Sequence, residues 1–360
     1  NDHIAIYAKA ENLPLRSITY NELFKQVEAL AHSLKSLGVK EGDRVAGFIP
    51  NIPEAVIAML ATSAIGAIWS SASPDFGVKG VLDRFKQIEP KIVFASDGYY
   101  YNGKEFDSLE KLNNILKDLP SVEKTIIINQ INNQKRTGLS FDFVNFDEFV
   151  SKSPDKLHFA QLPFDHPLYI MYSSGTTGLP KSIVHSSGGT LIQHWKELRL
   201  HCNLSKEDTI FYFTTCGWMM WNWLISALSI GSSIVLFDGG PFYPDNKKLW
   251  EIAEQLEITI FGTSAKYIDS CKGSGLKPKG IFNLSKLKTI LSTGSPLSNE
   301  NFRYVYENIK SNVLLGSISG GTDIISCFAL ANPILPVEEG ELQSIGLGMD
   351  VHAFDENGQQ

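Results

Sequence analysis

Hydrophobic residues near the start of the chain recur with the period of a helix. Thr19 and Glu22 have the spacing of a capping box, in which two side chains satisfy free backbone N–H groups at a helix start. The hydrophobic residues that follow recur at steps of four and three: Leu23, Val27, Leu30, Leu34 and Leu37. Gly38 suits the left-handed position that ends many helices. The pattern predicts an amphipathic helix over residues 19–37.

Short, almost uninterrupted hydrophobic runs follow, and such runs are typical of parallel strands buried on both faces. The predicted strands are residues 43–50, 92–95, 125–128, 168–172, 210–213, 233–237, 258–261, 289–291 and 313–317. Further helices are predicted over residues 53–65, 189–201, 246–256 and 298–310. The alternation indicates an α/β fold. Because the strands are too many for one ordinary sheet, we expect two stacked, mainly parallel sheets with flanking helices.

A polar stretch over residues 129–162 has few periodic hydrophobic positions and is the best candidate for an internal boundary. It predicts two α/β subdomains, approximately residues 1–150 and 163–331. After Asn332 the pattern changes, because Pro333, Pro336, an acidic run over residues 338–341 and repeated glycines favour short antiparallel strands.

Composition excludes several classes of protein. The 360 residues are 43% hydrophobic and 20% charged, with 29 glycines and 16 prolines, which excludes collagen-like, coiled-coil and disordered chains. A net charge of −7 offers no broad basic surface for nucleic acid. The longest hydrophobic stretches, residues 56–69 and 224–237, are interrupted by Ser, Thr and Gly, and neither reaches the roughly 18 residues of a membrane span.

Cysteine and histidine spacing predicts neither a disulfide framework nor a metal centre. The four cysteines form no CxxC pair, which favours free thiols in a reducing compartment and a cytoplasmic location. His166, His194 and His201 lack the spacing of metal ligands.

The segment with the clearest chemistry is residues 172–181, which read YSSGTTGLPK. Glycines allow close backbone approach, hydroxyl groups donate to phosphate oxygens, and Lys181 adds a positive charge. The segment is not a Walker loop, because Pro180 stands where the second glycine should be. From composition alone, a phosphate-binding loop and a polar surface turn both remain open. For His185, just beyond this segment, contact with a ligand and a position in a turn both remain open.

The same segment resembles the signature loop of the adenylate-forming enzyme superfamily, and further motifs occur in the family's order at residues 37–45, 53–56, 237–241 and 316–323. Residues 69–77, 83–90 and 216–222 are similar to the acetoacetate-activating members. The resemblance implies an ATP-dependent acid–CoA ligase. In such enzymes the carboxylate attacks the α-phosphorus of ATP, and the thiol of coenzyme A then displaces AMP from the acyl-adenylate.

The resemblance also assigns nucleotide contacts, and the residues expected to hold the β and γ phosphates are Ser174, Gly175, Thr176, Thr177, Gly178 and Lys181. Thr322 and Asp323 are expected near the α-phosphate, where with Lys181 they form the catalytic set, and Asp323 is the expected Mg²⁺ ligand. The usual family residue at position 323 is Glu, which is one methylene longer. Gly294, Ser295 and Pro296 correspond to the adenine-binding loop, with Ser295 replacing the commoner Glu.

An acyl pocket is expected from Trp218, Met219, Met220, Thr293 and Gly320. Acetate-activating relatives carry Trp at the position of Gly320, so glycine implies room for a four-carbon acid, and Gly320→Trp should shift preference toward acetate. Preference for acetoacetate over butyrate needs a hydrogen-bond donor for the ketone. The open candidates are Trp218, Trp221 and Asn222.

Two alternatives stay open: a ligase for propionate or butyrate, and a nucleotide-binding module without catalysis. The expected partners are small molecules, namely ATP, the acid and CoA, with no nucleic acid and no membrane; the sequence does not predict an oligomeric state. By resemblance, residues 1–360 are an AMP-binding large domain incomplete at both ends, and residues 332–360 begin a small β-barrel. The family's C-terminal domain, with a lysine that assists adenylation, is expected beyond Gln360, so the fragment should be poorly active alone.

Overall fold

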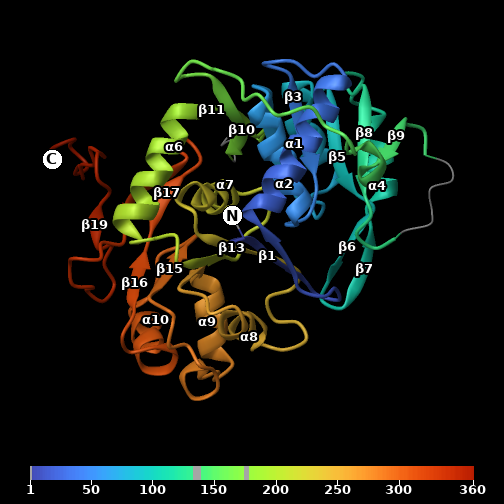
Figure 1. The fold of residues 1–360 in the computed structure, drawn as a ribbon. Helices are drawn as coiled ribbons and strands as arrows, with labels where there is room; N and C mark the ends of the chain where they lie inside the picture. The colour runs from blue at the N-terminus through green and yellow to red at the C-terminus, as the bar shows by residue number, and fades with distance from the viewer. Residues whose placement is uncertain (1, 133–138, 174–177) are drawn as a thin grey trace.

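The computed structural model describes residues 2–132, 139–173 and 178–360. Within them, two seven-stranded sheets lie on either side of a central group of helices (Figure 1). The first sheet has the strand order β16-β15-β14-β12-β13-β1-β2. Its strands are β1 (Ile4–Ala10), β2 (Arg16–Thr19), β12 (Thr209–Tyr212), β13 (Ser233–Asp238), β14 (Ile260–Ser264), β15 (Thr289–Thr293) and β16 (Leu314–Ser317). Neighbouring strands are parallel except β1 and β2.

The second sheet has the order β11-β10-β4-β3-β5-β8-β9. Its strands are β3 (Arg44–Phe48), β4 (Ile68–Ala72), β5 (Ile92–Ser96), β8 (Lys124–Ile128), β9 (Phe143–Asn145), β10 (Pro167–Ser173) and β11 (Lys181–Ser186). They are parallel except β10 and β11. Smaller units are the hairpin β6 (Gly98–Tyr101) and β7 (Lys104–Asp107), and the antiparallel sheet of β17 (Ser319–Gly321), β18 (Ser326–Leu330) and β19 (Ser344–Ile345).

Helices cover both faces of both sheets. The central layer holds α1 (Tyr20–Ser36), α2 (Pro53–Ala64) and α7 (Met219–Ser226), whose buried side chains join the inner faces of the two sheets in one core. The outer face of the first sheet is covered by α8 (Lys248–Gln255), α9 (Ala265–Gly273) and α10 (Asn299–Tyr304). The second sheet's outer face is covered by α3 (Val78–Ile88) and α4 (Leu109–Leu116). Burial on both faces explains the continuous hydrophobic runs of the strands.

The remaining helices are short or continue longer ones. They are α5 (Phe146–Phe149), α6 (Ser187–Lys196), the π-helical turns η1 (Glu197–His201) and η4 (Val305–Ile309), and the 3-10 turns η2 (Ala227–Ile230) and η3 (Pro278–Gly280). The predicted fold class, two mainly parallel sheets with flanking helices, is confirmed. The capping box at Thr19 and Glu22 is also present, and Gly38 has a φ of 87°.

The two sheets exchange edge strands, so they do not follow the expected subdomain division at residues 150–163. Strands β1 and β2, from the start of the chain, extend the first sheet by pairing with β13. Strands β10 and β11, which come after residue 163, extend the second sheet next to β4. Each sheet therefore needs residues from both parts of the chain.

A buried amide joins the sheets at their centre. Asn51 follows β3 and is 3% exposed. Its side-chain N–H groups donate to the carbonyl oxygens of Thr214 at 3.3 Å and Phe237 at 3.4 Å, which belong to the other sheet's loops and strands. Its Oδ1 accepts from the indole N–H of Trp221 in α7 at 2.9 Å. These bonds fix the sheets relative to each other on the side where the candidate site lies.

Candidate functional site

The expected phosphate loop connects two antiparallel strands, β10 and β11, which pair from Ser173 opposite Lys181. Four of its expected ligands, Ser174, Gly175, Thr176 and Thr177, lie outside the described residues. Gly178 has a φ of 99°, in the region that favours glycine, and Lys181 is exposed at the start of β11.

Gln87 of α3 fixes the end of this loop, a role that sequence reasoning missed. Its side-chain N–H donates to the carbonyl oxygen of Pro180 at 2.8 Å, and its Oε1 accepts from the Ser182 hydroxyl at 2.8 Å. Both neighbours of Lys181 are therefore held by one side chain, while the lysine itself faces solvent. No local sequence signal indicated this contact, because Gln87 lies 93 residues before Pro180.

The expected adenine loop and the expected catalytic turn leave neighbouring parallel strands. β15 ends at Thr293 and β16 ends at Ser317, and Ser292 pairs with Ser317. Beyond this pair, the backbone N–H of Ile318 donates to the Ser292 carbonyl oxygen at 2.8 Å. Gly294, Ser295 and Pro296 are exposed, and no atom of the residues that the structure describes lies within 4 Å of a Cβ built on Gly294. A flat ligand can therefore approach the backbone of this loop.

Thr322 and Asp323 form the turn between β17 and β18. The N–H of Ile325 donates to the Thr322 carbonyl oxygen at 3.1 Å, and Ile325 has a φ of 49°, which is rare for a β-branched residue. His185 of β11 is 7% exposed, and its imidazole hydrogen-bonds to the backbone of Thr322 near the Asp323 carboxylate. Burial outweighs both interactions and lowers the pKa of His185. The strand that begins at Lys181 thus reaches the turn that contains Thr322 and Asp323.

The expected acyl-pocket residues follow parallel strands of the first sheet, whose carboxyl ends share one edge. Trp218, Met219 and Met220 stand at the start of α7, and Trp218 is 63% exposed while Met220 is 9% exposed. The Thr293 hydroxyl is engaged within the protein, because it donates to the Ile318 carbonyl oxygen at 3.2 Å.

Two of the three candidate ketone donors are engaged within the protein. The Trp221 indole donates to Asn51, and the side chain of Asn222 bonds to Tyr169. Trp218 is therefore the best placed of the three to face a substrate.

The packing of β17 against β18 explains why position 320 is a glycine, and the sequence did not reveal this. A Cβ at this position would lie 2.1 Å from the carbonyl oxygen of Ser326 and 2.7 Å from the Cα of Cys327. Both are backbone atoms of β18, to which β17 is hydrogen-bonded across a bulge. A tryptophan at this position would have to displace β18, and the expected shift of Gly320→Trp toward acetate stays a prediction.

A carboxyl group with a raised pKa lies below the same edge of the sheet. Asp238, at the end of β13, is removed from water, and burial, with the negative charges of Glu11 and Asp75, raises its pKa from 3.8 to about 7. The backbone N–H of Asn51 donates to this carboxyl and opposes the shift, while Oδ2 has no partner among the described residues.

The pKa of Asp238 predicts a stability that falls as pH rises. Between pH 4 and 7 the unfolded state loses this proton and the native state keeps it, so the free energy of unfolding decreases toward pH 7 and the effect ends above it. Asp238→Asn, which does not titrate, should gain stability relative to wild type by about 1.4 kcal/mol per pH unit across this window. Urea unfolding at pH 4.5, 5.5 and 6.5 measures the difference, and a constant difference contradicts the prediction.

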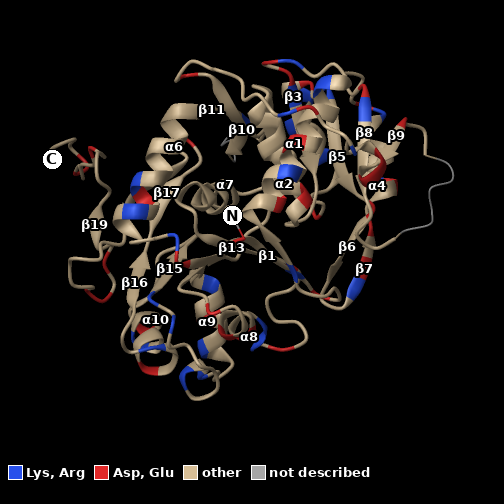
Figure 2. Cartoon of the chain, viewed as in Figure 1, with Lys and Arg blue, Asp and Glu red and all other residues tan. Residues whose placement is uncertain are grey.

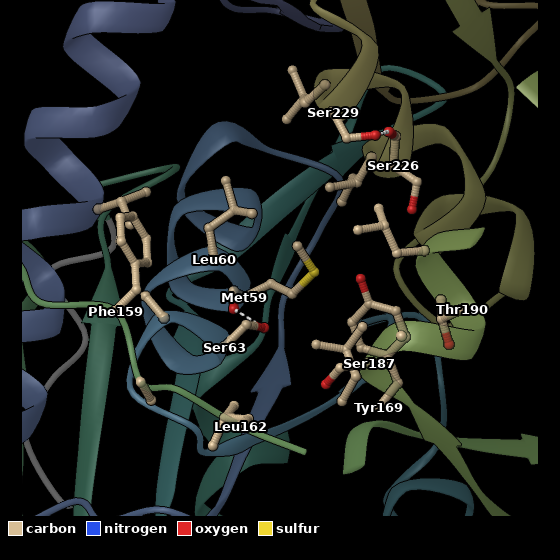
Figure 3. Close-up of a pocket in the computed structure, with 18 of the residues that line it drawn as sticks. Met59, Leu60, Ser63, Phe159, Leu162, Tyr169, Ser187, Thr190, Ser226 and Ser229 are labelled. Carbon is tan, nitrogen blue, oxygen red and sulfur yellow. Dashed lines mark hydrogen bonds between the residues drawn. The ribbon is translucent and has the colours of Figure 1, made fainter. Parts of the chain in front are cut away.

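A cavity of about 760 Å³ lies at the opposite end of β10, between α1, α2, α6 and α7. Figure 3 shows Met59, Leu60, Phe159 and Leu162 facing Tyr169 and Thr190 across it. Several of its hydroxyl groups bond to protein carbonyl oxygens; for example, Ser63 donates to the Met59 carbonyl oxygen at 2.9 Å. The described residues that line the cavity include no Lys, Arg, Asp or Glu, so it does not suit a triphosphate. The candidate nucleotide site is therefore the strand edge rather than this cavity.

Charged residues are distributed over the outer elements, with both signs interspersed (Figure 2). The central helix α7 carries none. Among the described residues, no helix combines the length and the hydrophobicity that crossing a bilayer requires.

Comparison with known proteins identifies the family. The model of the family described as AMP-binding enzyme matches residues 1–353. An acetoacetyl-CoA synthetase from Gallus gallus is 51% identical over 99% of this chain and 55% of its own length. An acetoacetyl-coenzyme A synthetase from Rhizobium meliloti is 48% identical over 98% of this chain and 54% of its own. The structure of acetoacetyl-CoA synthetase from Streptomyces lividans superimposes with a TM-score of 0.94 at 43% identity, covering 99% of this chain and 55% of that one.

The chain therefore spans about half the length of the curated relatives that it matches. The family match extends over almost all of the chain and includes each of the motifs through which the sequence resembled adenylate-forming enzymes. The chain belongs to the AMP-binding enzyme family.

Proposed function

We propose that the chain is the large domain of an ATP-dependent ligase that joins acetoacetate to coenzyme A through an acetoacetyl-adenylate. The observation that carries this proposal is the junction of β15 and β16, where the Ile318–Ser292 hydrogen bond holds the expected adenine loop beside the strand that leads to Thr322 and Asp323. Ligands of parallel α/β sheets bind at this carboxyl edge. The relatives named as acetoacetyl-CoA synthetases support the choice of acid.

Adenylation asks the protein to position reactants and neutralise charge rather than to form bonds itself. In the proposed arrangement, residues 174–178 and Lys181 hold the β and γ phosphates, and the backbone of Gly294, Ser295 and Pro296 contacts the adenine. Gln87 supports this arrangement, because it fixes the backbone on both sides of Lys181. The carboxylate of the acid then meets the α-phosphorus beside Thr322 and Asp323, and pyrophosphate leaves.

Asp323 suits Mg²⁺ by its chemistry and its exposure. Mg²⁺ usually takes one or two carboxylates together with substrate phosphates and keeps several waters. Asp323 is exposed in its turn, and the described residues contain no group of three or more potential ligands that would form a dedicated cage. When bound, Mg²⁺ neutralises charge on the phosphates. Asp323 would hold the ion, and Thr322 would contact the α-phosphate.

The acyl group is proposed to lie against Trp218, Met219 and Met220, with Thr293 and Gly320 on the opposite wall. Trp218 is the proposed donor to the ketone, because the polar groups of Trp221 and Asn222 already bond to Asn51 and Tyr169. A ketone buried without a donor costs about 1–3 kcal/mol. The indole N–H would therefore favour acetoacetate over butyrate.

We further propose that residues 332–360 begin a small β-barrel subdomain and that a C-terminal domain completes the enzyme. The share of the relatives' length that the chain covers, 55% for the avian protein, supports this organisation. Residues 1–360 alone should then exchange pyrophosphate poorly. The four buried, free thiols favour a cytoplasmic location.

A panel of acids tests the proposed function. Acetate, propionate, butyrate, acetoacetate and hexanoate are compared in ATP–pyrophosphate exchange and thioester formation by the full-length protein. We expect acetoacetate to exceed butyrate in kcat/KM by about 10-fold or more, since butyrate has no ketone oxygen and would leave the Trp218 indole N–H in the site without an acceptor. Equal rates for butyrate or propionate would favour the other short-chain ligases. ATP binding without exchange for any acid would favour a non-catalytic nucleotide-binding module.

A further inference from the structure

Three buried polar side chains form a stripe along α6 and η1, and all three bind one segment. His194, Glu197 and His201 are each 0–1% exposed. Their spacing of three and four residues places them on one face of the helix. His194 Nε2 donates to the Ile325 carbonyl oxygen at 2.7 Å, and His201 Nδ1 lies 2.7 Å from the Ala331 carbonyl oxygen. Between them, Glu197 Oε1 accepts from the Cys327 N–H at 3.0 Å. This polar stripe therefore binds the backbone of β18 from end to end.

Glu197 makes the largest set of these contacts. Besides the Cys327 N–H, its Oε1 accepts from the Ser326 hydroxyl and, more weakly, from the Gln193 amide at 3.5 Å. Its Oε2 accepts from the Trp223 indole N–H at 2.8 Å. The Lys196 ammonium lies 3.7 Å from Oε1 and has no hydrogen-bond partner among the described residues. A fully buried carboxylate is costly unless donors surround it, and here donors from α6, α7 and β18 converge on it.

The segment held by the stripe begins with a strained turn. Ile325, with its φ of 49°, directly precedes β18 and lies two residues after Asp323. Such backbone is strained and persists only where the surrounding structure holds it in place. Two side chains hold the backbone at Ile325. His194 donates to the Ile325 carbonyl oxygen, and Glu197 accepts from Ser326 and Cys327, which follow immediately. Neither side chain reaches Asp323, so their effect on it passes through the backbone.

We propose that Glu197 is a positioning residue for adenylation, which sets the conformation of the Thr322–Asp323 turn by anchoring the start of β18. The inference rests on the proposed function and adds a residue that belongs to no motif of the site. Glu197 stands 126 residues before Asp323 in the chain, on a helix that contributes no expected ligand contact. Its carboxylate fixes where the exposed Asp323 side chain lies, rather than touching substrate.

The test is Glu197→Gln, which keeps the size of the side chain but turns an N–H group toward donors. In the full-length protein, we expect the kcat of acetoacetate-dependent ATP–pyrophosphate exchange to fall about 10–100-fold, since a displaced catalytic group costs this much. The KM for ATP should change less than about twofold, because adenine and the β and γ phosphates are bound elsewhere, whereas the Mg²⁺ concentration for half-maximal rate should rise. Leu200→Ala, on the exposed side of the same turn, is the matched control and should behave as wild type.

A double mutant separates positioning from general loss of structure. If Glu197 acts through Asp323, Glu197→Gln combined with Asp323→Asn should be no slower than Asp323→Asn alone, within about twofold. If the double mutant is slower than Asp323→Asn by the full factor that Glu197→Gln causes alone, the proposal is overturned. A wild-type kcat for Glu197→Gln would also overturn it. If Glu197→Gln is insoluble, Trp223→Phe tests the proposal instead, because it removes one hydrogen-bond donor to Glu197 Oε2. We expect Trp223→Phe to lower kcat as well, and a wild-type kcat for this variant overturns the proposal. Wild-type protein inactive with acetoacetate would instead refute the proposed function.

Discussion

Replacing Asp323 with asparagine should reduce acetoacetate-dependent ATP–pyrophosphate exchange by about 10²–10³-fold. Asparagine keeps the shape of the side chain but removes the negative charge that we propose holds Mg²⁺ against the phosphates. Loss of one preorganised electrostatic contact to the reacting group typically has an effect of this size. Asp323 is exposed, so the fold does not depend on its charge. The change should therefore appear in kcat and in the Mg²⁺ requirement, and thermal unfolding should be unchanged.

Two further variants sharpen this prediction. Asp323→Glu restores the residue usual in the family, and because the turn is open to solvent the longer side chain has room, so activity should stay within about tenfold of wild type. Asp118→Asn, a half-exposed aspartate paired with Lys86 at 3.3 Å away from the strand edge, controls for loss of one surface charge. Exchange by Asp323→Asn within threefold of wild type would exclude the proposed metal role.

Gly320→Ala should destabilise the protein by about 3 kcal/mol and abolish most activity. The added methyl carbon would lie 2.1 Å from a backbone oxygen of β18, and a backbone clash is not relieved by a rotamer change. We expect β17 to separate from β18, which would carry Thr322 and Asp323 away from the nucleotide. Urea unfolding followed by circular dichroism measures the stability, and pyrophosphate exchange measures the site.

Gly321 provides the matched control one residue further along the same strand. Within the described part of the chain, no atom lies within 4 Å of a Cβ built there, and its φ is not in the left-handed region. Gly321→Ala should therefore change stability by less than about 1 kcal/mol. If both alanines are tolerated equally, the close approach of β17 and β18 does not explain the glycine, and the acyl-pocket explanation regains its force.

Local sequence patterns predicted the helices and strands that neighbouring residues determine. The helix α1 begins at the predicted capping box, and most predicted strands occur within a few residues of their expected bounds. The strand β4 was missed because Ser70 and Ser71 interrupt its hydrophobic run. In the structure the Ser70 hydroxyl donates to the Ile170 carbonyl oxygen at 2.9 Å, so a buried polar residue is satisfied by a strand 100 residues away. No local pattern records such a partner.

The candidate site likewise has parts that a local sequence pattern predicts and parts that depend on residues far away in the chain. The motifs at residues 172–181, 292–296 and 316–323 were visible because each is contiguous, and their roles remain predictions. The supports of these loops were not visible, since Gln87 and Glu197 act across 93 and 130 residues respectively. Gly320 has a further constraint that similarity to relatives did not indicate, because a side chain there would meet the backbone of β18.

The exchange of edge strands has a consequence for how the chain is made. On the ribosome, Ile4–Ala10 emerges long before its parallel partner β13, which ends at Asp238. At about 5–20 residues per second, roughly 10–50 s pass before that partner exists. During this interval a hydrophobic segment has only the short strand β2 beside it, and an exposed strand edge invites pairing with other chains. Newly made protein should therefore depend on chaperones until residue 238 has been translated, and truncations ending before it should aggregate.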